Sequence, residues 1–314
     1  MSIAAPFPKE SDATGAFVRQ KSAFRDRITA DGSSGFPAEA GRYHLYVSLA
    51  CPWAHRTIIV RNQKGLADAI SLSVVDPLRD ERGWRFGPDF PDPLGHGWSY
   101  LAEAYRATDP SFDGRVTVPA LWDTKTGRVV NNESADILVM LNEELDAFAD
   151  HPDLDLYPAA LRPEIDELNA WVYDDINNGV YKSGFASSQE SYEAAVRPLF
   201  AALKRADERL ATRRYLFGPQ PTLADWRLFT TLVRFDAVYV GHFKCNLKRI
   251  ADFPHLSGYL RDLYQQPGVA ETVDFDHIKR HYYMTHGSIN PTGIVPAGPL
   301  LDLEAPHGRE GLST

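Results

Sequence analysis

The pattern of apolar and polar positions changes character about halfway along the chain. The first half carries short strand-like stretches separated by single helical patterns, and the second half is helical throughout. The strand patterns cover residues 43–49, 70–75, 117–122 and 128–130. Helical patterns cover residues 51–64, which Gly65 closes, and 133–145. From Leu161 onward the predicted amphipathic helices cover residues 163–178, 189–211, 222–239 and 255–266.

The order strand, helix, strand, insertion, strand, strand, helix is the plan of a thioredoxin-like domain. We therefore predict an α/β N-terminal thioredoxin-like domain followed by an all-α C-terminal domain. The expected parts are an N-terminal arm (1–41), the thioredoxin-like domain (42–147), a linker (148–160), an all-helical domain (161–288) and a C-terminal tail (289–314). The insertion at 77–115 is rich in Gly, Pro and aromatic residues, and loops of that length are usually functional or mobile.

Composition narrows the class of protein. The 314 residues carry a net charge of −9, which disfavours nucleic acid as a partner because phosphate binding needs clustered Lys and Arg. No apolar run is long enough for a membrane span, and the stretch from Met1 to Asp12 lacks the apolar core of a secretion signal. The two cysteines, Cys51 and Cys245, cannot form a disulfide framework. We expect a reducing, cytoplasmic setting.

Cys51-Pro52-Trp53-Ala54 is the sharpest chemical signal. A cysteine at the start of a helix meets unpaired backbone N–H groups and the positive end of the helix dipole, which favour its thiolate. Pro52 suits the first helical position because its missing N–H needs no partner there. Ala54 stands where a Cys-x-x-Cys pair would have its second cysteine, so an external thiol must resolve a mixed disulfide on Cys51. The alternative is a buried structural cysteine.

Two further motifs fit a site for a peptide-like thiol. Val118-Pro119 opens a strand, and in a thioredoxin-like fold this proline is typically cis, which leaves the backbone of Val118 available to a peptide; the alternative is an edge-strand proline. Glu133-Ser134 follows a strand and opens a helix. The N-terminus of this helix can bind a carboxylate, and Glu133 can bind an ammonium group, which are the two charged groups at the γ-glutamyl end of glutathione. Ser134 taken alone is better explained as an ordinary helix cap.

Other polar clusters are interpreted as structural. Thr222 and Asp225 resemble a capping box that begins a buried helix. His277 and His281 have helical spacing, but no Glu lies between them and no carboxylate cluster supports a metal, so none is expected. Cys245 is expected to be packed in the interior.

The chain resembles the glutathionyl-hydroquinone reductases, the Xi class of glutathione transferases, over about residues 15–300. In the first half the matching motifs are Phe36-Pro-Ala-Glu, Gly41-Arg-Tyr-His-Leu-Tyr-Val, Cys51-Pro-Trp-Ala-His-Arg, Thr117-Val-Pro-Ala-Leu-Trp-Asp and Asn132-Glu-Ser. In the second half they are Asn178-Gly-Val-Tyr-Lys, Gly184-Phe-Ala, Arg234-Phe-Asp-Ala-Val-Tyr, His242-Phe-Lys-Cys-Asn and Ile289-Asn-Pro-Thr-Gly-Ile-Val-Pro. Cys-Pro-Trp-Ala together with the Asn-Pro-Thr-Gly tail is highly specific, since ordinary transferases lack that tail.

The resemblance implies a glutathione transferase fold, a homodimer and an enzyme that removes glutathione from glutathionyl-hydroquinones, with glutathione as co-substrate. It makes Cys51 the nucleophile and places Tyr181 and Tyr282 against the quinol, with Tyr283 as the neighbouring alternative. The residues expected to bind glutathione are Trp84, Arg85, Val118, Pro119, Glu133 and Ser134.

Three alternative functions are also compatible with these residues. An omega-like or glutaredoxin-like thioltransferase, or a dehydroascorbate reductase, would share Cys51 but would not need the tyrosines or the tail. A non-catalytic binding module with the same fold would not need a reactive thiol. A serine-type conjugating transferase would only orient the glutathione thiolate, whereas a cysteine forms a mixed disulfide.

Overall fold

The computed structural model describes residues 12–312, and its contacts divide the chain into two compact units. In the described range, the first unit comprises Gln20–Asp155 and Asp276–Thr285, and the second comprises 12–19, Leu156–Phe275 and 286–312. Residues 1–11, where no secretion signal is expected, lie outside the described residues. The domain limits that we predict from the sequence stay predictions.

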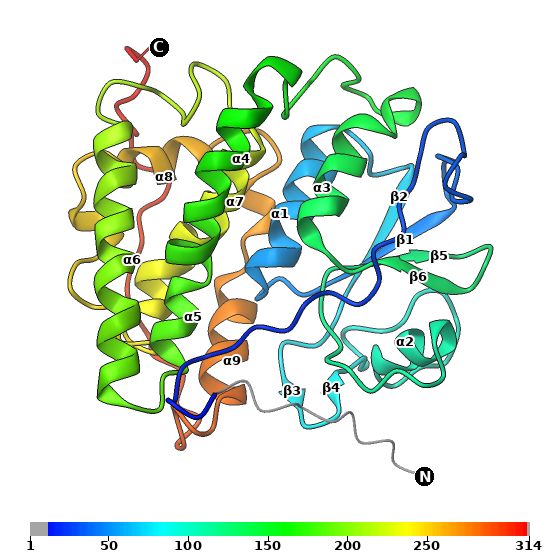
Figure 1. Cartoon of the computed structure of the whole chain (residues 1–314), viewed down its shortest axis with the longest axis horizontal. Helices are drawn as coiled ribbons and strands as arrows, with labels where there is room; N and C mark the ends of the chain where they lie inside the picture. Colours follow the sequence, from blue (N-terminus) through cyan, green and yellow to red (C-terminus); the bar gives the residue numbers. More distant parts are fainter. Residues whose placement is uncertain (1–11, 313–314) are drawn as a thin grey trace. The chain divides into compact units, whose positions relative to one another are not determined.

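A four-stranded mixed sheet forms the centre of the first unit (Figure 1). Its strands are β1 (Tyr43–Val47), β2 (Ile70–Val74), β5 (Ala120–Asp123) and β6 (Arg128–Asn131), in the order β2-β1-β5-β6. The β1–β2 pair is parallel, and the β1–β5 and β5–β6 pairs are antiparallel. All five residues of β1 are buried, as expected for an inner strand with both faces covered. The four predicted strands and the thioredoxin-like order are therefore confirmed.

Helices of the first unit pack beside this sheet. Helices α1 (Pro52–Gln63) and α3 (Ser134–Glu143) lie side by side, and α2 (Ala102–Thr108) contacts β6 (Figure 1). After Lys64, Gly65 adopts a φ of +67°, the left-handed conformation that glycine accepts most readily at the end of a helix. A short 3₁₀ turn at Asp146–Phe148 follows α3, and most of α9 (Phe275–Thr285) also belongs to this unit.

The insertion at 77–115 has more regular structure than we predict from its sequence. It contains the two-stranded ribbon β3 (Arg79–Asp80) and β4 (Gly83–Trp84) as well as α2. It is also attached to the sheet, because the ring of Trp98 meets Trp122 edge-on at 5.2 Å and the Tyr46 hydroxyl donates to Asp92 at 3.3 Å. The helix escapes prediction because seven residues are too few to show a helical period.

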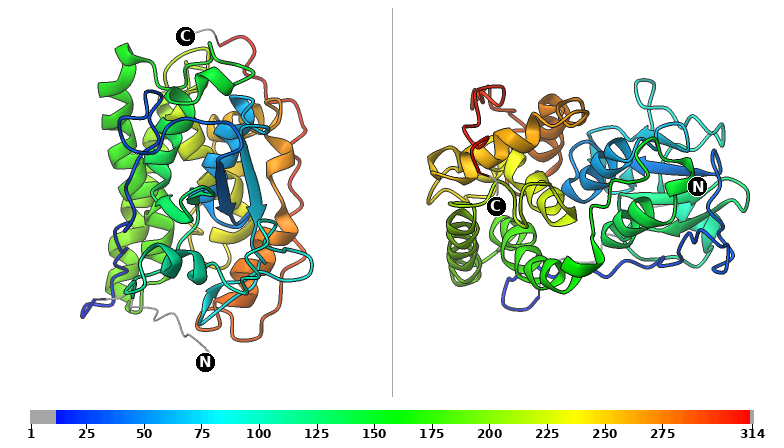
Figure 2. Two further views of the ribbon diagram at one scale, coloured as in Figure 1. Left: turned by 90° about the vertical axis from the view of Figure 1, so that its right-hand side faces the viewer. Right: turned by 90° about the horizontal axis from the view of Figure 1, so that it is seen from above.

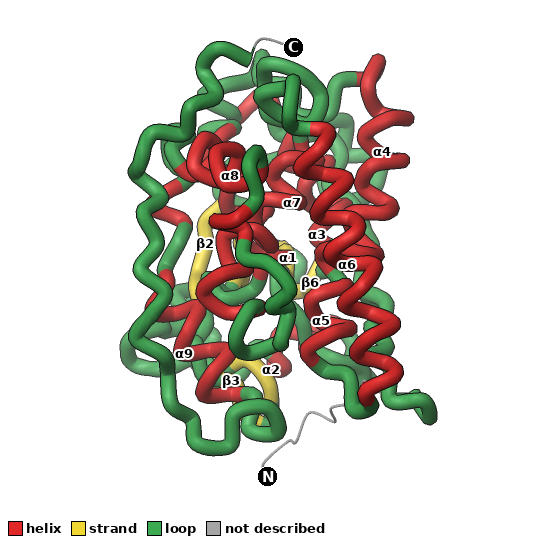
Figure 3. The backbone as a smooth tube through the Cα atoms, turned by 90° about the vertical axis from the view of Figure 1, so that its left-hand side faces the viewer, coloured by secondary structure: helices red, strands yellow, loops and turns green. Residues whose placement is uncertain are grey.

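The second unit is helical, and every described strand lies outside it (Figure 3). Its α-helices are α4 (Arg162–Trp171), α5 (Gly179–Gly184), α6 (Gln189–Arg209), α7 (Leu223–Arg234) and α8 (Leu256–Tyr264). π-helical turns extend α4 at Val172–Asn177 and α7 at Phe235–Tyr239, and 3₁₀ turns occupy Ala159–Leu161, Ile250–Asp252 and Ala270–Thr272. Helix α6 packs along α5, and the view from above in Figure 2 looks down the axis of α6.

The predicted capping box at Thr222 and Asp225 is present and buried. The Asp225 carboxylate accepts the Thr222 N–H at 2.8 Å, and the Thr222 side chain bonds back to the backbone of Asp225. The same carboxylate accepts the hydroxyl of Tyr259 at 2.8 Å, which ties α7 to α8. Burial raises the pKa of Asp225, against these hydrogen bonds. The cluster is structural, as its sequence indicates.

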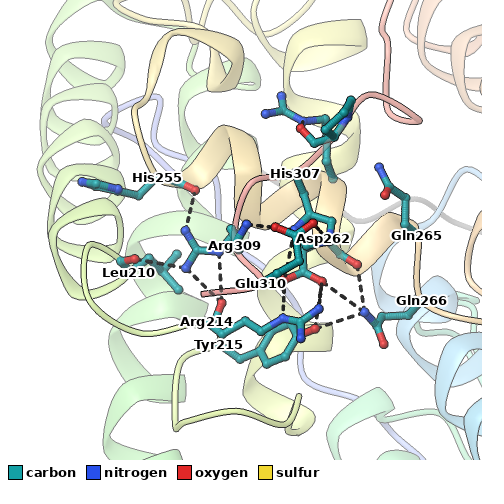
Figure 4. Close-up of polar contacts among 12 residues, drawn as sticks. Leu210, Arg214, Tyr215, His255, Asp262, Gln265, Gln266, His307, Arg309 and Glu310 are labelled. Atoms are coloured by element: carbon teal, nitrogen blue, oxygen red, sulfur yellow. Dashed lines mark hydrogen bonds and ion pairs between the residues drawn. The ribbon is translucent and has the colours of Figure 1, made fainter. Parts of the chain in front are cut away.

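In the second unit, the buried Arg309 near the end of the chain is hydrogen-bonded to the backbone of neighbouring helices and loops (Figure 4). Arg309 is 3% exposed and its guanidinium donates to the carbonyl oxygens of Leu210, Arg213, Arg214 and His255. Leu210 is the C-cap of α6, so the cation completes hydrogen bonds that a helix end leaves open. Gly258 allows the backbone at His307 to lie close to α8, since a Cβ at position 258 would stand 2.6 Å from the carbonyl oxygen of His307.

Candidate active site

Cys51 occupies the N-cap position of α1, with Pro52 as the first helical residue, as its sequence predicts. Its backbone is extended, at φ −80° and ψ 118°, and its carbonyl oxygen accepts the N–H of His55 at 2.9 Å. The side chain is partly exposed and does not cap the helix. The sulfur therefore stands at the positive end of a 12-residue helix, where a thiolate is favoured.

The backbone before Pro119 lies against this sulfur. Cys51 Sγ is 3.4 Å from the carbonyl oxygen of Val118, and the Val118–Pro119 peptide bond is cis, as predicted. Strand β5 begins only at Ala120, three residues later than the predicted strand, because proline has no N–H to give to a ladder. The chain thus brings the start of α1 and the residue before the cis proline together.

Glu133 and Ser134 begin α3. Glu133 is the N-cap, and its Oε1 accepts the N–H of Ala135 at 3.1 Å. Its Oε2 accepts the hydroxyl of Ser22 at 2.9 Å. Each carboxylate oxygen can accept a second hydrogen bond, so Glu133 retains capacity for an ammonium group. Ser134 is the first helical residue and is 3% exposed.

Trp84 and Arg85 follow the β3–β4 turn and have different surroundings. The indole of Trp84 is 5% exposed and stacks on His281 at 4.9 Å with an interplanar angle of 20°. Burial lowers the pKa of His281 to about 3, so the imidazole is neutral, and its Nδ1 donates to the carbonyl oxygen of Pro77 at 2.7 Å. Arg85 pairs with Asp76 at 3.1 Å.

The candidate tyrosines lie on two different helices. Tyr282 is on α9 in the first unit, is 2% exposed and meets His281 edge-on at 5.3 Å. Tyr283 follows it and is more exposed. Tyr181 is on α5 in the second unit and is half-buried. Cys51 and the other candidate residues all belong to the first unit.

Tyr181 packs in a group of aromatic rings that the sequence analysis does not predict. We call this group the Tyr181 cluster. Its rings other than Tyr181 belong to Phe17, Phe185, Tyr239 and Phe243, with centroids 5.5–6.4 Å from that of Tyr181. The guanidinium of Arg19 lies over the Tyr181 ring at 5.0 Å. Phe17 shows in the sequence only as part of a short apolar period in the arm, and Arg19 carries no sequence signal.

Cys245 and His277 lie outside this set of candidate residues. Cys245 is fully buried, and burial raises the pKa of its thiol to about 12, so it is a packing residue, as expected. His277 Nε2 lies 3.4 Å from the Ser48 hydroxyl, and the described part of the chain contains no group of three His, Cys, Asp or Glu side chains that could hold a metal ion. Within the same range, no helix has the length and apolar character to cross a membrane.

Comparison with known proteins identifies the class. Residues 50–144 match the family model "Glutathione S-transferase, N-terminal domain", and residues 189–262 match "Glutathione S-transferase, C-terminal domain". The chain is 55% identical over 305 residues to glutathionyl-hydroquinone reductase YqjG of Escherichia coli, covering 94% of this chain and 93% of that protein. It is 51% identical over 292 residues to glutathionyl-hydroquinone reductase PcpF of Sphingobium chlorophenolicum, covering 92% and 91%. The chain belongs to the glutathionyl-hydroquinone reductases, the Xi class of glutathione transferases.

Solved structures agree with this assignment. The glutathione-bound structure of YqjG from E. coli K-12 superposes with a TM-score of 0.89 at 54% identity, covering 92% of this chain and 96% of that one. The glutathione-S-transferase Xi from Phanerochaete chrysosporium superposes with a TM-score of 0.91 at 49% identity, covering 95% and 98%. The glutathione transferase fold that we predict is confirmed.

Proposed function

We propose that this protein reduces glutathionyl-hydroquinones to hydroquinones, with glutathione as the reductant. The observation that carries the proposal is the position of Cys51, a partly exposed thiol at the start of α1 and 3.4 Å from the Val118 carbonyl oxygen. Two relatives that are 55% and 51% identical to this chain over more than nine-tenths of its length, YqjG and PcpF, are named glutathionyl-hydroquinone reductases.

Glutathione recognition follows from the backbone geometry around Cys51. An extended thiol peptide that pairs with the backbone of Val118 brings its own sulfur beside Cys51 Sγ. The start of α3 then receives the γ-glutamyl end, its carboxylate at the helix N-terminus and Ser134, and its ammonium at Glu133. Trp84 supplies an apolar wall, held in place by its stack on His281.

The first chemical step transfers glutathione to the enzyme. The Cys51 thiolate attacks the glutathionyl sulfur of the conjugate, so that an S–S bond forms as the C–S bond breaks. Because an aromatic carbon is a poor leaving group, a proton first moves from a ring hydroxyl to the carbon that bears sulfur, which gives a keto tautomer. The C–S electron pair then returns to the ring as the ring regains aromaticity, and the former carbonyl oxygen takes up a proton to give the hydroquinone.

The second step restores the enzyme. The thiolate of a second glutathione attacks the glutathionyl sulfur of the mixed disulfide, which releases oxidised glutathione and the Cys51 thiolate. One conjugate and one glutathione thereby become one hydroquinone and one oxidised glutathione. Ala54 cannot perform this step, since it has no thiol. The scheme requires ping-pong kinetics.

Tyr181 and Tyr282 are the proposed proton donors and acceptors for the ring oxygens, with Tyr283 as the alternative to Tyr282. A phenol can hold a proton at a quinol oxygen while the ring changes tautomer. From the resemblance we further propose a homodimer, and from the cysteine usage a cytoplasmic setting. The proposed substrates are small molecules, and we propose no nucleic-acid or membrane partner.

The runner-up function is a thioltransferase or dehydroascorbate reductase of the omega or glutaredoxin type. Cys51 and the glutathione site serve both functions, so only the substrate distinguishes them. The Tyr181 cluster favours an aromatic substrate, because it surrounds a phenol with rings that disulfide exchange does not need.

The experiment is a product assay with the purified protein, glutathione and a synthetic glutathionyl-hydroquinone, followed by chromatography. Free hydroquinone and oxidised glutathione should appear in equal amounts with the intact protein and be absent with Cys51→Ala. If the conjugate persists while a glutathione mixed disulfide is reduced, the thioltransferase function is correct. If neither substrate reacts with the folded protein, the binding-module reading is correct.

A further inference from the structure

Arg19 touches two positions on one face of the helix that carries Tyr181. Its Nε donates to Oδ1 of Asn178 at 2.6 Å, and its guanidinium carbon stands 5.0 Å from the centre of the Tyr181 ring. Asn178 precedes α5 directly and lies three residues before Tyr181, which puts the two side chains on one helical face. A single guanidinium therefore links a buried amide to the face of the phenol.

Asn178 holds its end of this contact from a buried, hydrogen-bonded position. Asn178 is 5% exposed, and its N–H donates to the carbonyl oxygen of Tyr173 at 2.8 Å. A guanidinium is planar, so a short Nε bond to Asn178 restricts the orientation of the whole group above the ring. Arg19 itself is half-buried, and its guanidinium also lies 5.4 Å from the centre of the Phe17 ring.

The segment that carries Arg19 belongs to the second unit and is hydrogen-bonded to residues at the start of α6. The N–H of Ser187 donates to the carbonyl oxygen of Gly15 at 3.0 Å, and the hydroxyl of Ser191 donates to that of Thr14 at 2.9 Å. Phe17, two residues before Arg19, is 7% exposed and stacks on Phe185 at 5.5 Å. Residues 14–19 therefore form one side of the Tyr181 cluster.

We propose that Arg19 is a positioning residue for the quinol step, which acts by holding the Tyr181 ring in a fixed orientation. The inference rests on the proposed function, because it gives the phenol of Tyr181 a task at the quinol oxygens. The guanidinium covers one face of the ring and leaves the hydroxyl at the ring edge, where a hydrogen bond to substrate forms. Misplacement of a catalytic group by about 1 Å can cost on the order of 100-fold in rate.

A positioning role and a purely structural role differ in what they change. If Arg19 only fastens residues 14–19, its loss lowers every activity of the enzyme alike. If it orients Tyr181, its loss lowers kcat for the quinol conjugate, has little effect on KM, and spares glutathione exchange at Cys51. Its effect also disappears once the Tyr181 hydroxyl is gone, since no phenol proton remains to be placed.

The variants are Arg19→Met, Arg19→Lys, Tyr181→Phe and the double variant Arg19→Met/Tyr181→Phe. Lys182→Met is the matched control, because Lys182 is the next residue on the same helix and its ammonium pairs with exposed Asp174 at 2.6 Å. Each variant is assayed with a glutathionyl-hydroquinone and, separately, with a small glutathione mixed disulfide.

We expect Arg19→Met to lose roughly 10- to 100-fold in kcat for the conjugate and to stay within about twofold on the disulfide. Arg19→Lys, which keeps the charge but loses the planar fork, should lose less than Arg19→Met, and Lys182→Met should match the wild type. The double variant should equal Tyr181→Phe within about twofold. Equal losses on both substrates, or losses that multiply in the double variant, overturn the role of Arg19. A wild-type protein inactive on the conjugate overturns the proposed function itself.

Discussion

The sulfur of Cys51 lies 3.4 Å from the carbonyl oxygen of Val118, although the two residues are 67 positions apart in the sequence. Both ends of this contact are set by backbone features: the start of α1 at one end and the cis bond before Pro119 at the other. In the binding mode that we propose, a thiol peptide that pairs with the backbone of Val118 would bring its sulfur beside that of Cys51. This relationship makes the first unit suitable for glutathione chemistry.

The two cysteines should differ completely in their contribution to activity. Cys51→Ser should lower turnover of the conjugate by a factor on the order of 1000 or more, because a hydroxyl cannot form the mixed disulfide. Cys245→Ser is the control: the Cys245 thiol is buried and its pKa is raised to about 12, so the variant should retain wild-type turnover per folded molecule. Circular dichroism checks the fold of both. Residual turnover above a tenth of wild type in Cys51→Ser would exclude covalent catalysis at this position.

Removal of one hydroxyl should separate the two substrate classes. Tyr181→Phe keeps the ring and its aromatic neighbours, so the fold and the glutathione site should be unaffected. We expect its kcat for the glutathionyl-hydroquinone to fall by roughly 100-fold, the usual contribution of a placed proton donor. Reduction of a small glutathione mixed disulfide should change by less than about twofold, since that exchange needs no proton at a ring oxygen. Equal losses in both assays would show that Tyr181 has no specific role in the quinol step.

The buried guanidinium of Arg309 should be a major contributor to the stability of the second unit. Arg309→Met leaves the carbonyl oxygens of Leu210 and Arg214 without this donor, and we expect the free energy of unfolding to fall by about 3 kcal/mol. Arg197→Met is the matched control, because the Arg197 side chain is 74% exposed and its ion pair with Glu193 contributes little. Urea denaturation of both variants measures the difference. A loss at Arg309 no larger than that at Arg197 would mean that the tail is not fastened as the structure has it.

Acidification should weaken the first unit through His44. The imidazole is 1% exposed, its ring nitrogens lie 2.7 and 2.8 Å from the hydroxyls of Ser71 and Ser73, and burial lowers its pKa to about 4. In the unfolded chain the pKa of His44 is near 6.5. Between pH 6.5 and pH 4, His44 is therefore protonated in the unfolded chain and neutral in the folded chain. The stability that neutral His44 contributes is complete above pH 6.5 and is lost as the pH falls toward 4.

This linkage amounts to about 3 kcal/mol across the window. Denaturant titrations at pH 7 and pH 4.5 should show a smaller drop in unfolding free energy for His44→Gln than for the wild type. His151→Gln, at an exposed position, should drop as much as the wild type. Parallel pH dependence in wild type and His44→Gln would exclude this contribution.

Sequence reasoning succeeds where a local rule decides the structure. The alternating strands, Pro52 at the first turn of α1 and the capping box at Asp225 each follow from a few adjacent residues, and the cis proline follows from the fold class that they predict. The same reasoning places Cys51 at the start of a helix, and the structure has it at the N-cap of α1.

Features built from distant segments are beyond such rules. Helix α2 is too short to show a period, and α5 contains two glycines, which lower helix propensity, yet both helices form against other elements. The contact of Arg19 with Tyr181 joins residues far apart in the chain, and neither residue type signals the other. The hydrogen bonds from Arg309 to carbonyl oxygens cannot be predicted from the sequence either, because every residue has a backbone carbonyl and none indicates which one Arg309 contacts.

A single turnover without free glutathione tests the covalent mechanism most directly. The protein is mixed with one equivalent of a glutathionyl-hydroquinone, quenched in acid and measured by intact-protein mass spectrometry and chromatography. We predict one hydroquinone released per chain, with no oxidised glutathione, and one glutathione bound by a reducible bond that peptide mapping assigns to Cys51. Hydroquinone released without a protein adduct, or no release until free glutathione is added, would contradict the covalent mechanism.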